Sequence, residues 1–254
     1  MDTARIAVLL EPFLESPLDP NQLDQISIYI DLLKRWNARI NLTAIRGEEE
    51  IVTRHFGESL FLAQHLFPAP EKNCHPERSH VIREADGVAE SKDPYPTTMA
   101  VAPSHPEANR GPMRVLDIGS GAGFPALPLK LWAPTIALTL IESNHKKATF
   151  LREVIRTLTL TNVNVMAARA QTVAATPDFP RAEVVTLRAV EHFETILPQA
   201  EVFVAPSGRL ALLIGAAQLP HLPKMKSINW SEPISIPKSH SRVLSIGIHH
   251  QSGN

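Results

Sequence analysis

The stretch from Val115 to Pro125, VLDIGSGAGFP, constrains this chain more than any other. An apolar, β-prone run leads to an acid, and glycine then recurs at every second position. This pattern predicts a buried strand that ends in a tight loop, with a helix after it over residues 125–132. Glycines let the backbone approach a ligand that a Cβ would exclude, and the free N–H groups of the helix point to the same spot. The loop is therefore expected to bind a ligand.

A second acid follows at the interval that such a loop predicts. Apolar residues alternate over 136–140 as in a strand, and Glu142 stands at its end, one strand–helix–strand interval after Asp117. The order D-x-G-x-G-x-G resembles the nucleoside-binding loop of class I methyltransferases, which use S-adenosylmethionine, and differs from the dinucleotide fingerprint G-x-G-x-x-G. The alternative is a glycine-rich turn that binds nothing, and the agreement of loop, helix and acid disfavours it.

Composition narrows the setting in which the chain folds. Its 254 residues can hold one large or two small domains, and 44% are hydrophobic, which is enough for a packed core. The single cysteine, Cys74, excludes an internal disulfide and a cysteine-rich zinc site, and we expect no metal. The first 18 residues carry three acids and make a poor signal peptide, and no stretch approaches 18 apolar residues. We therefore expect a cytoplasmic protein without a membrane partner.

Two helices are predicted near the start of the chain. Asp19, Pro20 and Gln22 suit the N-cap, N1 and N3 positions, and apolar residues follow at steps of three and four. A further helix is predicted over residues 48–66. Residues 1–67 should thus form a small helical unit.

Residues 68–113 differ in composition from their surroundings. Prolines interrupt a polar run that has no sustained apolar periodicity. We expect a disordered or loosely packed insertion at a surface connection, where folds of this kind tolerate extra chain. A methyltransferase domain then spans residues 114–250.

The opening segment narrows the class further. The residues WNARINLTAIR at 36–46, then RH at 54–55 and Ser59, resemble the start of the RsmG (GidB) family. These bacterial methyltransferases modify N7 of one guanine in small-subunit (16S) ribosomal RNA. Two positions depart from the family pattern. Glu58 stands where Asp is usual, and Gly57 stands where the family has an apolar residue. Within a helix, glycine lowers stability by about 1 kcal/mol relative to alanine.

The resemblance continues along the second half of the chain. The segment IESNHKKATFLR at 141–152 matches the family's second strand end and following helix, AARAQ at 167–171 matches its third turn, and VVTLRA at 184–189 its fourth strand. Gln171 stands in place of a glutamate. Ile214 stands in place of a lysine, so a cation expected near the RNA or the site is missing.

The resemblance implies a set of cofactor-binding residues. Glu142 would hold the ribose hydroxyls, and the backbone of Ala170 and Gln171 would read the adenine. Arg188 would anchor the cofactor carboxylate or an RNA phosphate bidentately. The full set is Gly119, Gly121, Phe124, Glu142, Ala170, Gln171 and Arg188.

Candidates for RNA contact lie in the helical unit and after the second strand. Because the net charge is −1, the chain needs a local basic face to attract RNA. The alternatives are a turn residue at Asn41, a hydrogen-bonded core histidine at His55, and solvated helix faces for the cations. The candidates are Asn41, Arg46, Arg54, His55, Lys146 and Lys147.

The expected fold is α/β, a class I S-adenosylmethionine-dependent methyltransferase preceded by the helical unit. Its sheet should be doubly wound and mostly parallel, with an antiparallel closing strand. Later strands are expected at 163–166, at 184–189 and, after a turn at 206–208, at 209–214. Residues 236–243 and 243–248 should form the closing pair.

The expected function is methyl transfer from S-adenosylmethionine to guanine N7 of small-subunit RNA, free or in a particle, by a monomer. N7 carries a lone pair and no proton, so no general base is needed and no catalytic residue is assigned. Two alternatives stay open. One is a cofactor-binding, RNA-associated protein with little or no activity, suggested by Ile214, Gln171 and Gly57. The other is a small-molecule methyltransferase on the same fold.

Overall fold

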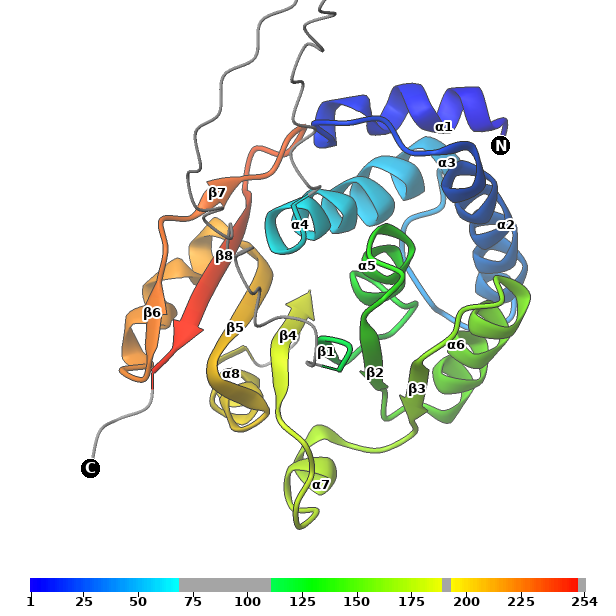
Figure 1. Ribbon diagram of the computed structural model, residues 1–254. Coiled ribbons are helices and arrows are strands. Elements are labelled where there is room, and N and C mark those ends of the chain that lie inside the picture. Colours follow the sequence, from blue (N-terminus) through cyan, green and yellow to red (C-terminus); the bar gives the residue numbers. More distant parts are fainter. Residues whose placement is uncertain (69–110, 189–192, 251–254) are drawn as a thin grey trace, which may run out of the picture. The chain divides into compact units, whose positions relative to one another are not determined.

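The computed structural model describes residues 1–68, 111–188 and 193–250 (Figure 1). Its α-helices are α1 (Thr3–Leu10), α2 (Pro20–Asn37), α3 (Glu48–Glu50), α4 (Glu58–Leu66), α5 (Ala126–Trp132), α6 (His145–Thr157), α7 (Ala170–Ala174) and α8 (Phe193–Val202). Three further helical segments are the 3-10 helices η1 (Glu11–Phe13) and η3 (Ala216–Lys224) and the π-helix η2 (Ile51–Gly57). The strands are β1 (Arg114–Ile118), β2 (Ala137–Ile141), β3 (Val163–Met166), β4 (Ala182–Arg188), β5 (Val204–Gly215), β6 (Ile228–Trp230), β7 (Ile234–Ser235) and β8 (Arg242–His249).

The strands form one sheet in the order β3-β2-β1-β4-β5-β8-β6, and β7 pairs with β8. Strands β1 to β5 are parallel, and β8 runs antiparallel to β5. The chain moves outward from β1 to β3 and then returns to the other side of β1 at β4. In open parallel sheets, ligands bind at the carboxyl ends of the strands beside such a switch point. The predicted fold class, including the antiparallel closing strand, is confirmed.

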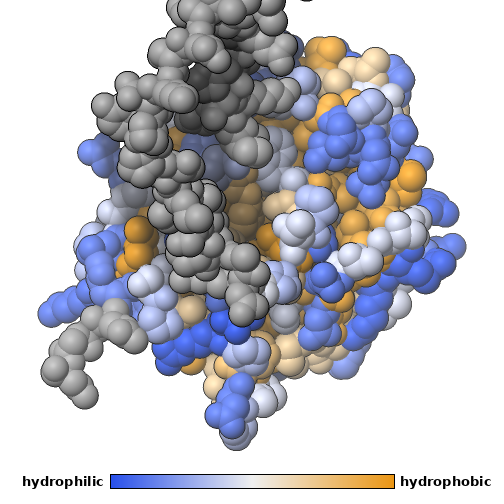
Figure 2. Space-filling model, viewed as in Figure 1, coloured by the Kyte–Doolittle hydropathy of each residue, from blue (hydrophilic) through white to orange (hydrophobic). Residues whose placement is uncertain are grey.

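Helices cover both faces of the sheet and create two apolar cores (Figure 1). Helices α1, α2, α4, α5 and α6 lie over one face, and α7, α8 and η3 over the other. Successive strand residues alternate between the two cores, so Leu213 packs in the first and Ile214 in the second. Figure 2 shows hydrophilic side chains crowding the right-hand side, where α2 and α6 lie in Figure 1, with apolar patches between them.

The N-terminal helices share a core with the sheet. Asp19 and Gln22 form the predicted capping box, because Gln22 N–H donates to Asp19 Oδ1 at 2.8 Å and Asp19 N–H donates to Gln22 Oε1 at 3.0 Å. The apolar face of α2 packs in the same cluster as β1, β2 and α5. The described residues on either side of 69–110 cluster as one compact unit. The boundaries expected for the helical unit and the methyltransferase domain stay predictions.

The helix predicted over residues 48–66 is present but irregular. Helix α3 passes into the π-helix η2, which ends at Gly57 where α4 begins. Phe13 explains the glycine, because a Cβ at position 57 would lie 2.7 Å from its ring. Glycine at position 57 therefore lowers the helix propensity but allows close packing against an aromatic ring. π-helical turns are rare and often lie at functional sites.

Two predictions about the last strands were wrong. The turn expected at 206–208 lies inside β5, which accommodates Ser207 at a φ of 59°. Residues 236–241 form a turn, because Pro237 lacks an N–H for a ladder and Lys238 has a φ of 59°. The closing strand is β8, which pairs antiparallel with β5, β6 and β7. Helices α1 and α8 and strand β6 were not predicted.

One arginine contacts both ends of the segment 69–110, which lies outside the described residues. Arg209 Nη1 donates to the Leu66 carbonyl at 2.9 Å, and its Nη2 lies 3.7 Å from Met113 Sδ. Trp132 Nε1 donates to the Phe67 carbonyl at 2.9 Å. Leu66 and Met113, which flank this segment in the sequence, therefore contact the same side chain. The insertion expected over 68–113 stays a prediction.

Candidate functional site: the carboxyl ends of the parallel strands

The glycine loop after β1 has a backbone that requires glycine. Gly119, Gly121 and Gly123 have φ values of 70°, 54° and 88°, a region that side chains rarely adopt. The N–H groups of Gly119 and Ser120 donate to the Ile141 carbonyl at the end of β2, at 2.9 and 3.1 Å. A Cβ at Gly119 would meet no atom of the described chain within 4 Å. The space beside this glycine is open to a ligand.

Glu142 lies at the end of β2 beside the loop. Its Oε2 accepts the Gly121 N–H at 2.8 Å, and its Oε1 accepts the Asn144 N–H at 2.7 Å. Asn144 in turn caps α6 with its side chain. A carboxylate has about four acceptor positions, so Glu142 keeps capacity for hydroxyl donors of a ligand.

Asp117 is the buried acid at the end of β1. Thr186 on β4 donates to its Oδ1 at 2.6 Å, and its Oδ2 has no hydrogen-bond partner among the described residues. Burial raises the pKa of Asp117 to about 7, and Thr186 and Ser120 oppose that rise by hydrogen bonding. A buried acceptor without a partner is costly, so a donor on a ligand at this position would be favoured.

The helical unit contacts and supports the glycine loop on the buried side of the loop. Tyr29 on α2 donates to the Ala122 carbonyl at 2.5 Å, and its ring stacks on Phe124 with centroids 5.3 Å apart. A Cβ at Gly123 would lie 2.3 Å from the Tyr29 hydroxyl and 2.6 Å from Leu127. Gly123 therefore serves packing, whereas Gly119 faces open space. Sequence analysis did not identify Tyr29 as a site residue, because its position in the sequence indicates only a residue on the apolar face of a helix.

The residues expected to read adenine begin α7, shortly after β3. The Met166 carbonyl at the end of β3 accepts the Glu142 N–H at 3.1 Å, which sets β3 beside Glu142. Ala170 is buried and Gln171 is exposed. The glycine loop, Glu142 and this turn thus lie along the carboxyl ends of β1 to β3. Their assignment as cofactor contacts stays a prediction.

Arg188 ends β4 and is buried against the helical unit. Its Nη2 lies 3.0 Å from Glu58 Oε2 and 2.6 Å from the Arg54 carbonyl, and its guanidinium lies 6.0 Å from the centre of the Phe124 ring. Arg242, at the start of β8, lies 3.1 Å from the same Glu58 oxygen. Burial lowers the pKa of Arg188 to about 10, so it remains a cation at neutral pH. Sequence analysis identified Arg188 as a site residue, but it did not predict that Arg188 and Arg242 meet Glu58.

His55 lies between Arg188 and Thr43 and stacks on Phe124, with ring centroids 4.6 Å apart. Arg188 can only donate, so His55 Nδ1 accepts at 2.9 Å and the ring proton sits on Nε2, 2.8 Å from Thr43 Oγ1. Burial, and then the Arg188 charge, lower the pKa of His55 to about 3. The structure thus places His55 as a neutral, hydrogen-bonded core histidine, and its contact with RNA stays a prediction.

Asn37, rather than Asn41, organises the loop after α2. Its Oδ1 accepts the Leu42 and Thr43 N–H groups at 2.9 and 3.1 Å, and its Nδ2 donates to the Thr43 carbonyl at 3.0 Å. Asn41 is exposed. The loop is therefore shaped by one amide and leaves the other on the surface.

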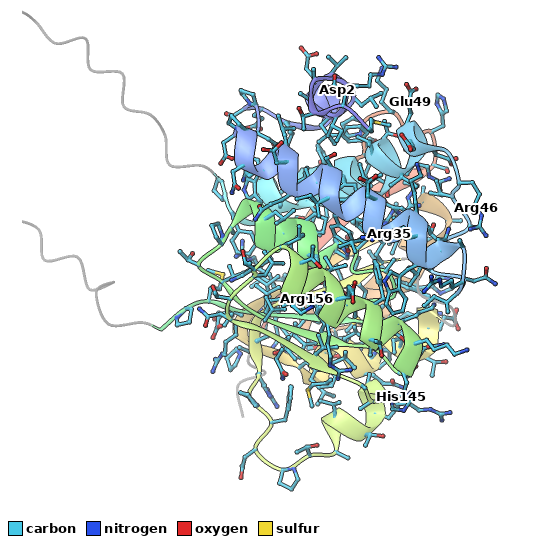
Figure 3. The ribbon with its side chains drawn as sticks, turned by 90° about the vertical axis from the view of Figure 1, so that its right-hand side faces the viewer. Asp2, Arg35, Arg46, Glu49, His145 and Arg156 are labelled. Atoms are coloured by element: carbon cyan, nitrogen blue, oxygen red, sulfur yellow. The ribbon has the colours of Figure 1, made fainter. Side chains whose placement is uncertain are left out.

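The remaining cationic candidates lie at the surface. Arg46 and Lys146 are exposed, Lys147 is half-buried, and Arg54 pairs with Glu50 at 2.9 Å. Figure 3 shows Arg35 on α2 and Arg156 on α6 on the face toward the viewer, with Arg46 and His145 toward the same side. Acids share this face, since Asp2 and Glu49 lie on it and Glu153 is 3.9 Å from Arg156.

Ile214 lies near the carboxyl end of β5, and its side chain is buried. It is 4% exposed and packs in the second core with Leu212, Leu222 and Val243. A lysine at this position would have its stem among apolar side chains. Ile214 and Gly57 thus both pack closely against apolar side chains.

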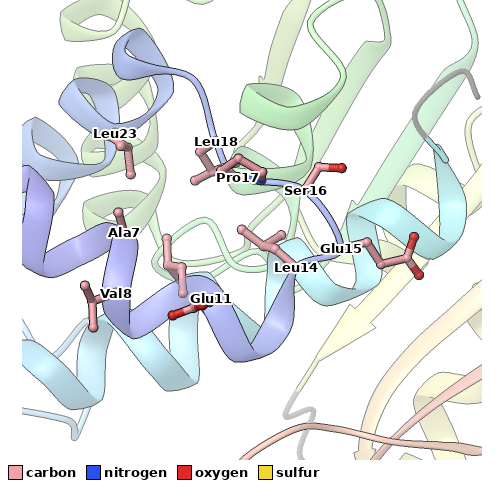
Figure 4. A pocket seen from close by; sticks show the side chains of 10 residues that line it. Ala7, Val8, Glu11, Leu14, Glu15, Ser16, Pro17, Leu18 and Leu23 are labelled. Atoms are coloured by element: carbon pink, nitrogen blue, oxygen red, sulfur yellow. The ribbon is translucent and has the colours of Figure 1, made fainter. Parts of the chain in front are cut away.

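Other features of the described chain carry no sign of the chemistry. A cavity of about 510 Å³ between α1, η1 and α2 (Figure 4) is lined by leucines and by Glu11 and Glu15, and it contains no predicted site residue. No group of three or more His, Cys, Asp or Glu side chains in the described ranges could hold a metal ion. No described helix is both long and apolar enough to cross a membrane.

The sheet order, the glycine loop after β1 and the acid ending β2 define an S-adenosylmethionine-dependent methyltransferase of class I. The family model for rRNA small subunit methyltransferase G (GidB) matches residues 22–73 and 99–241. The chain belongs to this family. It is an rRNA methyltransferase of the kind that methylates guanine N7 in 16S rRNA with S-adenosylmethionine.

Several relatives share most of their length with this chain. Ribosomal RNA small subunit methyltransferase G of Chloroflexus aggregans is 35% identical over 91% of this chain and 83% of its own. The protein of the same name from Xylella fastidiosa is 30% identical over 89% of this chain and 88% of its own. Among solved structures, a fibrillarin/Nop5p complex aligns with a TM-score of 0.47 at 16% identity, over 55% of this chain and 74% of that one.

Proposed function

We propose that this chain binds S-adenosylmethionine across the carboxyl ends of β1 to β3 and receives the guanine over β4 and β5. The observation that carries the proposal is the open space beside Gly119, next to a buried carboxylate with spare acceptor capacity. A cofactor backbone could approach there without meeting a Cβ. Glu142 would accept the ribose hydroxyls, and Ala170 and Gln171 would contact the adenine.

The bound cofactor would supply a methyl group on a sulfonium, already activated for transfer. Guanine N7 has a lone pair and no proton, so the chain needs no general base. Its residues would instead orient the guanine in line and exclude water, which is where the rate gain of such a reaction lies. Neutral His55 and paired Arg188 suit a positioning role, because neither is poised to remove a proton.

We further propose that the protein acts as a monomer on small-subunit RNA in the cytoplasm. One chain carries every proposed cofactor contact, so a second copy need not complete the set. Cations on α2, the 38–47 loop and α6, among them Arg35, Arg46 and Arg156, could receive RNA phosphates.

Two measurements test this proposal. Mapping N7-methylguanine in small-subunit RNA from cells with and without the gene should show one guanine whose modification depends on the gene. Calorimetry should show that S-adenosylhomocysteine binds more tightly than NAD. Unchanged methylation without the gene, or a preference for NAD, would reject the proposal.

A further inference from the structure

The first helices of the chain enclose a cavity that the proposed methyl transfer does not use. It has a volume of about 510 Å³ and lies between α1, η1 and the chain that leads into α2. Figure 4 shows the Glu15 side chain at one end of this cavity and Leu23 at the other. Ligand sites in proteins typically have volumes of about 300–1,000 Å³, so the cavity is large enough to hold side chains of a partner.

Most of the cavity wall is apolar and remains open to solvent. Val8 lines it and is 56% exposed, although its side chain is a hydrocarbon. Leu14, Leu18 and Leu23 also line it, and each is half-buried. Contiguous apolar side chains that stay open to solvent mark interaction sites, because removing them from water is favourable. The wall therefore favours an occupant with apolar side chains.

Two acids, Glu11 and Glu15, complete the lining of the cavity. Both are exposed, and neither forms an ion pair with a cation of the described chain. Residues 1–25 contain five aspartates and glutamates but only one arginine and no lysine, and that arginine, Arg5, pairs with Glu49. The apolar cavity thus lies in an acidic part of the chain, which favours a positively charged occupant.

The same acids disfavour RNA and a second copy of this chain as occupants. The carboxylates of Glu11 and Glu15 would repel RNA phosphates. A second copy that binds through the same face about a two-fold axis would bring these acids opposite their own counterparts. A segment of another protein that carries lysine or arginine meets neither obstacle.

We propose that this cavity is a docking site for a basic amphipathic segment of another protein. The apolar side chains of the segment fill the space between the leucines, and its lysines or arginines pair with Glu11 and Glu15. A segment suits the cavity better than a small molecule does, since the cavity extends from Leu23 on α2 to Glu15 beyond η1. The inference goes beyond the proposed function, because the cavity contains none of the proposed cofactor residues.

The test measures binding of a synthetic helical peptide to the full-length protein by fluorescence anisotropy. Leucines form one face of the peptide and lysines the other, and a second peptide with glutamate in place of every lysine should bind at least about tenfold more weakly. Glu11→Gln combined with Glu15→Gln should weaken binding of the lysine peptide about tenfold and make it less sensitive to salt. The matched control is Asp178→Asn combined with Glu232→Gln, which neutralises two exposed acids outside the cavity. It should leave the affinity within about twofold of the parent.

A further variant, Val8→Ser, removes apolar surface without changing the charge. Because Val8 is exposed, Val8→Ser should fold normally and weaken binding of the lysine peptide about threefold. If neither Val8→Ser nor the glutamine pair weakens binding, the peptide binds elsewhere and the proposal is wrong. Equal weakening by the control pair would reduce the effect to net charge and would also reject it. A loss of affinity for a small-subunit RNA fragment in the glutamine pair, with peptide binding unchanged, would assign this face to RNA instead.

Discussion

Replacing Gly119 or Gly123 by alanine should damage the protein in different ways, although both glycines belong to one loop. Both have positive φ values, 70° and 88°, so an alanine costs about 1–2 kcal/mol of backbone strain at either position. At Gly119 the new Cβ meets nothing within 4 Å of the described chain. In Gly119→Ala, backbone strain should then account for the whole loss of folding stability.

At Gly123 the Cβ would lie 2.3 Å from the Tyr29 hydroxyl and 2.6 Å from Leu127. Overpacking of this kind costs about 1–3 kcal/mol, and loss of the hydrogen bond from Tyr29 to the Ala122 carbonyl adds about 1 kcal/mol. The total is about 3–6 kcal/mol. Since 1 kcal/mol shifts the melting temperature of a chain of this size by about 2–4 °C, Gly123→Ala should melt far below Gly119→Ala.

Ligand binding should rank the two variants in the opposite way. Gly119→Ala should lose about tenfold or more in S-adenosylhomocysteine affinity, equivalent to about 1.4 kcal/mol, because its Cβ enters the space proposed for the cofactor. The assays are thermal melting with and without ligand, and calorimetry. Gly47→Ala is the control, since Gly47 has a neighbour only at 3.8 Å and lies away from the loop. Normal affinity in Gly119→Ala would refute the cofactor position, and equal melting of the two loop variants would refute the Tyr29 brace.

Four other changes have expected outcomes. Glu142→Gln should weaken S-adenosylhomocysteine binding about tenfold or more through lost charge-assisted hydrogen bonds, and normal calorimetric affinity would show that Glu142 does not hold the ribose. The pKa of His55 falls from 6.5 to about 3 on folding, so the folded state binds fewer protons between these values and loses stability as pH falls from 6.5 to 3. His55→Gln should therefore flatten the melting temperature against pH over that range, and an unchanged slope would contradict the burial of a neutral ring. Joining Ala69 to Gly111 by a short linker should leave the melting temperature within a few degrees of the parent. Arg209 contacts residues on both sides of the segment, and the entropy of loop closure changes slowly with loop length. Loss of cooperative melting would show that the segment packs on the core. Ile214→Lys should lower the melting temperature without strengthening RNA binding, with Ile214→Met as the control for size, and a gain in RNA affinity would mean that the lysine reaches the surface.

Local patterns in the sequence predicted the parts of the site that depend on neighbours along the chain. The capping box of Asp19, the positive φ values of the loop glycines and the acid ending β2 each follow from residue types a few positions apart. The sequence did not predict the burial of Ile214, because its packing in the second core depends on residues far away in the chain, such as Leu222 and Val243.

The contacts that complete the site join residues far apart in the chain. Tyr29 meets Ala122 across 93 positions, and Arg188 meets Glu58 across 130. No periodicity within one element identifies such a pair, since it depends on how helices and strands pack. The turn after β7 was missed although local residues indicate it: Pro237 lacks an N–H group, and Lys238 has a φ of 59°.

The hydrogen bond from Tyr29 to the Ala122 carbonyl has a consequence for the genetics of this protein. Docking of α2 adds this bond to those that the loop makes with Ile141 and Glu142, so apparent ligand affinity should fall with the fraction of molecules in which α2 is docked. Core residues of α2 such as Ile26 and Ile30, which touch no proposed ligand, then control binding through that fraction. Inactivating substitutions should consequently be scattered through the interior of the N-terminal helices, where a selection for lost methylation would recover them as readily as changes in the loop itself.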